Sequence, residues 1–167
     1  LFTDMVPRPL RADGGDLTTW LTDILQSQIL PGAWNTLLVT QLTLVLSGLF
    51  ALLLFPLLSK QFSRLPVRLL GHGLMVVLRS TPEIILAFIF LLLWGPSMLP
   101  AVIALSLHNG AILSHLIARH SNEVPLRDDV STGLNRYLYE IVPRIYGQFL
   151  AFLCYRWEVI LRESAIV

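Results

Sequence analysis

The stretch Asn122–Pro143, NEVPLRDDVSTGLNRYLYEIVP, is a charged, polar island between two strongly apolar runs. Unsatisfied backbone groups and charges cannot stay in hydrocarbon, so we expect this stretch to protrude into water. We predict short helices that break at Gly133, and we expect Pro143 to close the island. Its residues leave two interpretations open: an ordinary solvated loop, or a docking element that a soluble partner grips.

The rest of the chain has the composition of a membrane protein. Of its 167 residues, 54% are hydrophobic and only 14% are charged, against about 25% charged residues in an average soluble domain. Lysine and arginine are dispersed, so we expect no nucleic-acid partner. The chain begins at Leu1 rather than at a methionine and stops inside an apolar stretch at Val167. We therefore expect a piece of a longer membrane protein.

The apolar runs predict an all-α bundle of transmembrane helices. Trp34–Leu58 is free of charge and longer than the roughly 20 residues that a span needs. Buried small residues are typical of closely packed membrane helices, and they recur along Ala101–Ala118. The predicted helices are Trp34–Leu58, Leu65–Leu78, Pro82–Trp94, Ala101–Ala118 and Tyr146–Val167.

A helix break is predicted at Arg79-Ser80-Thr81-Pro82-Glu83. Pro82 has no N–H and disfavours a helical conformation at Thr81. A proline in a first helical turn followed by Glu83 suits the start of a new helix. The helix after the break is too short to span a membrane alone, so part of the helix before it must contribute.

The distribution of charge predicts the topology. Lys60, Arg64 and Arg68 follow the first span with no acidic residue between them, which places this side in the cytoplasm. The polar stretch 122–143 is then cytoplasmic as well. We expect residues 1–31 outside, as an irregular segment followed by an amphipathic helix over Asp16–Leu30, and residues 32–167 as the membrane core. That helix lies in the membrane interface or on a soluble surface.

The last helix carries charge on two opposite sides. At about 100° per residue, Arg156 and Glu163 share one side, whereas Glu158 and Arg162 are spaced i,i+4 on the other. A charged side chain facing lipid is costly, so this helix should be sandwiched between other helices or line an aqueous path. Two interpretations remain: an internally paired structural helix near the membrane surface, or a lining for a polar solute such as an anion.

No pattern for catalysis or metal binding is present in the sequence. It has no GxxxxGK[ST], GxGxxG or HExxH motif and no local signature of a catalytic triad. His108 and His115 share a helix face without a carboxylate or cysteine, which makes a poor metal site. We expect no catalytic residue, metal or cofactor, and any ATP would be bound by another subunit.

The ordered motifs resemble the membrane subunits of bacterial ABC importers, specifically the phosphonate-type permease family. The likeness extends over residues 32–163. It is carried by Asn35-Thr36-Leu37, Arg79-Ser80-Thr81-Pro82-Glu83, Gly95-Pro96, the run Ala101–His108, Tyr155-Arg156-Trp157-Glu158 and Arg162.

This resemblance implies a type I permease-like bundle, with further spans before Leu1 and after Val167, in the bacterial inner membrane. It implies a translocation path for phosphonate or a related oxyanion, with Arg156, Glu158 and Arg162 along it. We expect Arg156 to contact the solute and Arg162 to pair with Glu158. The implied partners are an ABC ATPase subunit, a periplasmic solute-binding protein and a second permease subunit, identical or different.

In that family the cytoplasmic loop carries a Glu-Ala…Gly…Leu-Pro motif that docks into the ATPase. Gly133 and Pro143 match it, but Arg127 and Asp128 stand at the Glu-Ala positions and Val142 replaces the leucine. The expected coupling residues are Arg127, Asp128, Asp129, Gly133, Arg136 and Pro143. These departures keep a second function open: a non-transporting membrane scaffold that keeps the fold and has lost coupling.

Overall fold

Most of the described part of the chain is helical. The computed structural model describes residues 16–125 and 133–166, and no strand occurs among them, which confirms the all-α class. Residues 1–38 and 39–167 form separate compact units. The helices are α2 (Leu17–Ile24), η2 (Leu25–Ile29), α3 (Leu30–Leu58), α4 (Leu65–Ser80), α5 (Glu83–Trp94), α6 (Met98–Glu123), η3 (Arg136–Ile141) and α7 (Val142–Ser164).

The described residues of the first unit begin with a capped helix. The Asp16 carboxylate accepts hydrogen bonds from the backbone N–H of Thr18, at 3.4 Å, and from its hydroxyl, at 2.6 Å. The helix that starts there does not end at Leu30 as expected, because helical residues continue into α3 through Pro31. The π-helical turn η2 ends at Ile29, two residues before this proline, and such local adjustments accommodate a missing backbone N–H.

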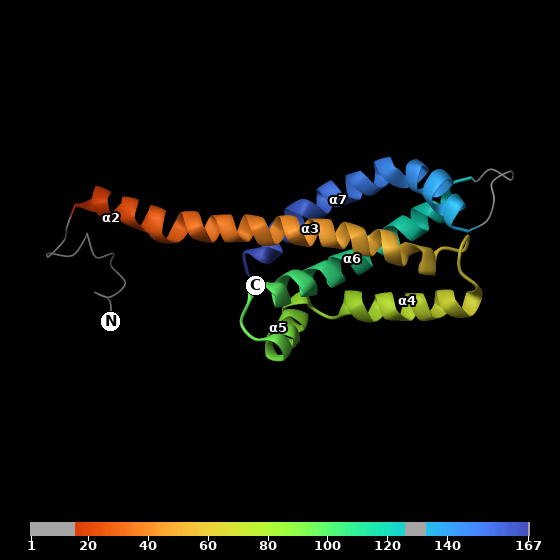
Figure 1. Ribbon diagram of the computed structural model, residues 1–167, viewed down its shortest axis with the longest axis horizontal. Coiled ribbons are helices and arrows are strands. Elements are labelled where there is room, and N and C mark those ends of the chain that lie inside the picture. The colour runs from red at the N-terminus through yellow and green to blue at the C-terminus, as the bar shows by residue number, and fades with distance from the viewer. Residues whose placement is uncertain (1–15, 126–132, 167) are drawn as a thin grey trace. The chain divides into compact units, whose positions relative to one another are not determined.

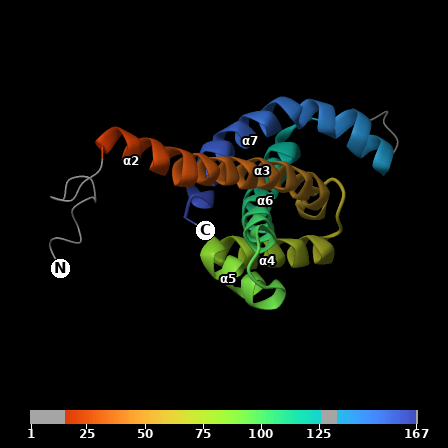
Figure 2. The same ribbon diagram turned by 60° about the vertical axis from the view of Figure 1, so that its left-hand side comes forward.

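The second unit is organised around α6. Figures 1 and 2 both place α6 in the middle of this unit, with α4 on one side and α7 on the other. More residues are buried on α6 than on any other described helix, and many of them are small, as the sequence predicted. Its side chains pack with those of α3, α4 and α7 in one core that includes Phe55, Met75, Leu113, Ile117 and Ile145.

The backbones of α3 and α6 approach closely at Gly110. A Cβ atom placed on Gly110 would lie 2.9 Å from Cβ of Phe50 and 3.3 Å from the carbonyl oxygen of Ser47. Four residues before Gly110, the Ser106 hydroxyl donates to the carbonyl of Thr43 at 3.5 Å. Small residues allow this kind of contact between membrane helices.

The predicted helix break at Arg79–Glu83 is confirmed. α4 and α5 are separated by Thr81 and Pro82, both with extended backbone, and the two axes meet at 91°. In Figure 1, α5 turns away from the line of α4 at this point. Gly95, with φ of 80°, ends α5 in a conformation that glycine adopts without a steric penalty.

Helical residues 17–58 and Met98–Glu123 are long and apolar enough to cross a membrane, and α4 with α5 makes a third candidate if the bent pair is one span. α7, with its charged second half, is not among the candidates found in the described residues. Large apolar side chains such as Leu70, Leu92 and Leu93 are mostly exposed, as suits helices that contact lipid or other helices.

The limits of the polar stretch differ from those predicted. α6 extends through Glu123, and the helix that resumes after Gly133 continues past Pro143. The expectations that Pro143 closes the island and that the last helix begins at Tyr146 are therefore wrong. Pro143 lies in the first turn of α7, where a missing N–H breaks little, and η3 precedes it as a π-helical segment.

Candidate functional site

The charges in the second half of α7 divide into an exposed pair and two partly buried groups. Arg162 donates from Nη2 to Oε1 of Glu158 at 2.9 Å, so the predicted i,i+4 pair is present. Both side chains are 73% exposed in this chain. A pair this exposed to water contributes little to stability, about 0.3–0.5 kcal/mol for i,i+4 pairs on a helix.

Glu163 is held by α6 rather than by Arg156. The side-chain amide of Asn109, which is fully buried, donates to Oε2 of Glu163 at 2.9 Å and to the carbonyl of Leu105 at 3.0 Å. One residue further along α7, the hydroxyls of Ser164 and Thr40 lie 2.7 Å apart. These contacts fasten the end of α7 to α6 and α3.

Arg156 is half-buried on α7. Its Nε is buried and has no hydrogen-bond acceptor in the described part of the chain. A guanidinium group placed in this way has donor capacity that the surrounding side chains do not use. Among the charged residues predicted for the translocation path, Arg156 therefore has a buried donor without an acceptor in the described part of the chain.

At the helix break, Glu83 faces a histidine of α6. Oε2 of Glu83 lies 3.8 Å from Nε2 of His108, and Nδ1 of His108 lies 3.2 Å from the carbonyl oxygen of Leu78. The predicted break residue Arg79 is exposed in the last turn of α4, and Pro82 is exposed before α5. The sequence analysis assigned no carboxylate to His108 and missed this partner on α5.

The predicted coupling residues are described only in part. Arg127, Asp128 and Asp129 lie outside the described residues. Gly133 has φ of 99°, which confirms it as a position where the chain turns. Arg136 is half-buried at the start of η3, and Pro143 is exposed at the start of α7.

Tyr137 was missed by the sequence analysis although it fixes this segment to α3. Its hydroxyl donates to the carbonyl of Leu52 at 2.7 Å. Its ring stacks on that of Phe55, with centroids 5.4 Å apart, and meets Phe62 edge to face at 5.8 Å. Burial raises the pKa of Tyr137, so the hydroxyl keeps its proton and remains a donor.

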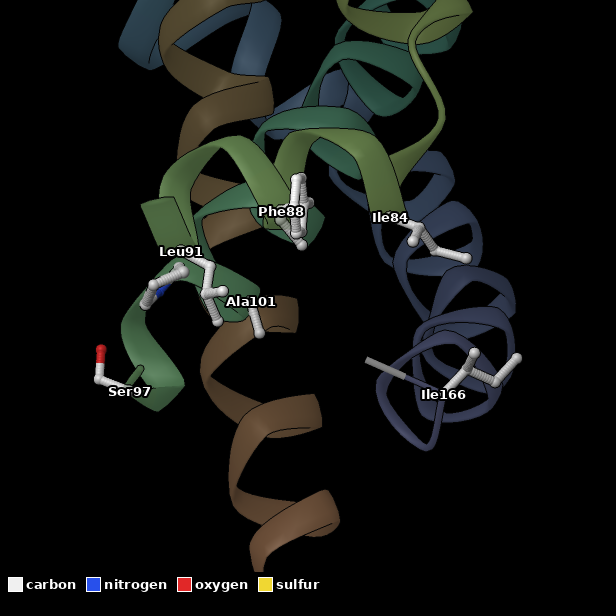
Figure 3. A pocket seen from close by; sticks show the side chains of 8 residues that line it. Ile84, Phe88, Leu91, Ser97, Ala101 and Ile166 are labelled. Atoms are coloured by element: carbon white, nitrogen blue, oxygen red, sulfur yellow. The ribbon is translucent and has the colours of Figure 1, made fainter. Parts of the chain in front are cut away.

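A further cavity of about 210 Å³ lies between α5, the start of α6 and the end of the described chain. Figure 3 shows Ile84, Phe88, Leu91 and Ala101 beside it, with Ile166 from the other side. Of the described residues that line it, Ser97 is the one with a hydroxyl group, and none is charged. This cavity offers nothing to neutralise an anion and suits an apolar group.

Comparison with known proteins gives two relatives with transport functions. The phosphite transport system permease protein PtxC of Stutzerimonas stutzeri is 33% identical over 100 residues, which cover 56% of this chain and 36% of that protein. The phosphate-import permease protein PhnE of Mycolicibacterium smegmatis is 26% identical over 181 residues, covering 98% of this chain and 33% of that protein. The chain is related to the permeases of ABC importers. It spans about a third of the length of these curated relatives.

One solved structure has a fold similar to that of this chain. A chain from the crystal structure of an amino acid ABC transporter with histidines superposes with a TM-score of 0.67 and 20% identity. The match covers 91% of this chain and 75% of the other chain. No protein-family model matches the sequence. The predicted permease-like helix bundle is thus confirmed as a fold.

Proposed function

We propose that this chain is part of the permease subunit of an ABC importer and forms a translocation path for phosphonate or a related oxyanion. The observation that carries the proposal is the likeness to PtxC and PhnE, whose names specify phosphite transport and phosphate import. Both solutes are tetrahedral phosphorus oxyanions, as phosphonate is. The solved structure of an amino acid transporter supports the fold and carries no argument on the solute.

An oxyanion that leaves water needs compensating positive charge along its path. The planar donors of a guanidinium group match two oxygens of a phosphorus oxyanion. We assign this contact to Arg156, because its buried Nε has no acceptor among the described residues. Arg162 is a weaker candidate, since its guanidinium already donates to Glu158.

The proposed coupling to an ATPase rests on the segment that begins at Gly133. Leu134 and Tyr139 are 73% and 78% exposed there and present apolar surface to a partner. Tyr137, between them, is bonded to Leu52 of α3. A movement of this segment caused by an ATPase subunit would therefore be transmitted to α3 through the Tyr137 side chain.

The remaining partners follow from the importer function. A periplasmic binding protein would deliver the solute, and a second permease subunit, identical or different, would complete the path in the inner membrane. ATP would be hydrolysed by a separate subunit, and this chain would have no catalytic role.

Uptake by the full-length protein, reconstituted in proteoliposomes with its ATPase and binding protein, tests the proposal. We expect uptake of labelled phosphite or phosphonate and none of an amino acid. Arg156→Gln should lower uptake while the yield of folded protein in detergent is unchanged, and Arg162→Gln is the matched control on the same helix. Normal uptake by Arg156→Gln would contradict its role. ATP hydrolysis and binding without any uptake would favour the membrane scaffold instead.

A further inference from the structure

Two adjoining cavities lie between α4 and α6, away from the charged residues of α7. The larger, of about 430 Å³, is lined by Lys60, His72, His115 and Arg119 together with neutral residues and Glu123. The smaller, of about 90 Å³, is lined by His72, Arg79 and His115 together with apolar residues. Because His72 and His115 line both, the two cavities form one groove. We call it the basic groove and define it by Lys60, His72, Arg79, His115 and Arg119.

The basic groove follows matching faces of two helices. His115 and Arg119 are one turn apart on α6, and His72 and Arg79 are two turns apart on α4. The imidazole rings of His72 and His115 meet across the groove, with centroids 5.8 Å apart. Arg79, Arg119 and His72 are all close enough to act electrostatically on His115. The cationic side chains Arg79 of α4 and Arg119 of α6 therefore lie on either side of the histidine pair, in the lining of one groove.

This positive charge is not neutralised by the described part of the chain. Its ion pairs join His108 to Glu83, Arg144 to Glu140 and Arg162 to Glu158, and none involves Lys60, Arg79 or Arg119. Among the described residues, Glu123 is the one carboxylate in the lining of either cavity. Like charges gathered in a partly enclosed space repel one another, and an anion bound among them relieves that repulsion.

The volume and the donors of the groove suit a phosphate-type group. A cavity of about 430 Å³ falls within the range of roughly 300–1,000 Å³ that small-molecule sites occupy. Guanidinium groups bind phosphate oxygens in pairs, an ammonium group adds a mobile donor, and an imidazole N–H adds another. The neighbouring apolar side chains of Met75, Val76 and Ala111 restrict access of water at the narrow end.

We propose that the basic groove between α4 and α6 is a binding site for a phosphate-type oxyanion. Two sources provide this chemistry: the phosphate of an anionic lipid headgroup, since α4 exposes apolar residues such as Leu70, and a free phosphorus oxyanion in solution. The proposal goes beyond transport, because a chain that moves no solute would still hold the same groove.

Binding to the purified full-length protein tests the site without any ATPase. The protein is placed in nanodiscs of phosphatidylcholine alone, and binding of inorganic phosphate and methylphosphonate is measured by calorimetry. In a second arm, nanodiscs with added phosphatidylglycerol are analysed for retained lipid by native mass spectrometry. Binding in the first arm identifies a free oxyanion, and retention in the second identifies a headgroup. Absence of both would overturn the proposal.

Substitutions locate the binding in the groove. Arg119→Gln should weaken the observed binding about tenfold or more, and Arg119→Lys should weaken it less, because charge is kept and the paired donors are lost. Lys60→Gln changes an exposed side chain, and it should weaken binding severalfold. Arg64→Gln, an exposed cation outside the groove, is the matched control. Equal losses in Arg64→Gln and Arg119→Gln would show a general effect of charge and would overturn the site.

This test separates the groove from the proposed transport function. If Arg156→Gln abolishes uptake while phosphate binding to the groove persists, the path and the groove are distinct sites. If uptake of phosphorus oxyanions fails and lipid retention depends on Arg119, the proposed function fails and the groove stands.

Discussion

Replacement of Gly110 by alanine tests whether α3 and α6 are packed at backbone contact. The new Cβ would lie 2.9 Å from Cβ of Phe50 and 3.3 Å from the carbonyl oxygen of Ser47. Neither of these two atoms can be turned away by a change of rotamer, because one belongs to the backbone and the other is attached directly to it. The two helices would have to separate by several tenths of an ångström.

The expected loss in the free energy of unfolding follows from this geometry. Overpacking in a well-packed core costs about 1–3 kcal/mol. Against this, alanine is favoured over glycine in a helix by roughly 0.5–1 kcal/mol. Gly73 provides a matched control, because it is also inside a helix and a Cβ there would have nothing within 4 Å. The helix-propensity gain is common to both variants, so Gly110→Ala should be about 1–3 kcal/mol less stable than Gly73→Ala.

Thermal unfolding and denaturant titration of the full-length protein in detergent measure this difference. We expect Gly73→Ala to match or exceed the stability of the unsubstituted protein and Gly110→Ala to fall below both. If the two variants unfold together, the close crossing of α3 and α6 at Gly110 is refuted. If Gly110→Ala alone is stabilised, the helices have room that this structure does not show.

Three further predictions concern contacts of α6, the coupling segment and α7. Asn109→Leu should lose about 1.5–3 kcal/mol of stability in detergent unfolding, because the Glu163 carboxylate loses a charge-assisted hydrogen bond. Glu163→Gln keeps an acceptor and should lose less stability. The reverse order would contradict the assignment. Gly133→Val should uncouple ATP hydrolysis from uptake, because φ of 99° strains a branched residue. Gly133→Asn should retain more coupling, and normal uptake by Gly133→Val would make the segment a simple connector. Arg162→Gln should change unfolding stability by no more than about 0.5 kcal/mol, since its pair with Glu158 is exposed, and a larger loss would mean that another chain buries the pair.

The elements that the sequence predicted well are those specified by local chemistry. The break at Pro82 follows from one missing N–H and one restricted neighbour, and the structure has its helices on either side of it. The turn at Gly133 was predicted on similar grounds and has the expected positive φ. Arg162 and Glu158 are one turn apart on one helix, so their pairing also needed no knowledge of the fold.

The same local reasoning failed where a proline is compatible with a helix. Pro143 was expected to close the polar stretch, yet helical residues continue through it, as they do through Pro31. A π-helical segment ends shortly before each of them, at Ile29 and at Ile141. These segments depend on how the surrounding turns adjust their hydrogen bonds, and no residue pattern in the sequence marks them.

Contacts between distant segments could not be predicted from one sequence. Tyr137 and Leu52 are 85 residues apart, and Asn109 and Glu163 are 54 apart. The basic residues His72 and His115 belong to different helices and appear scattered in the sequence, whereas the fold places their rings 5.8 Å apart. The signal that could have found such pairs is the presence of polar residues inside apolar helices, since each of them needs a partner when buried.

Two consecutive residues of α6 connect the helix break to the charged end of the chain. His108 contacts Leu78 and Glu83 on the two sides of the break, and Asn109 holds Glu163 on α7. Consecutive residues of a helix are about 1.5 Å apart along its axis and point about 100° apart, so these contacts lie at one level on different faces of α6. A shift of α5 that moves Glu83 away from His108 therefore acts next to Asn109, which holds Glu163 of α7. One turn of the most buried described helix thus makes both contacts, to the helix break through His108 and to α7 through Asn109.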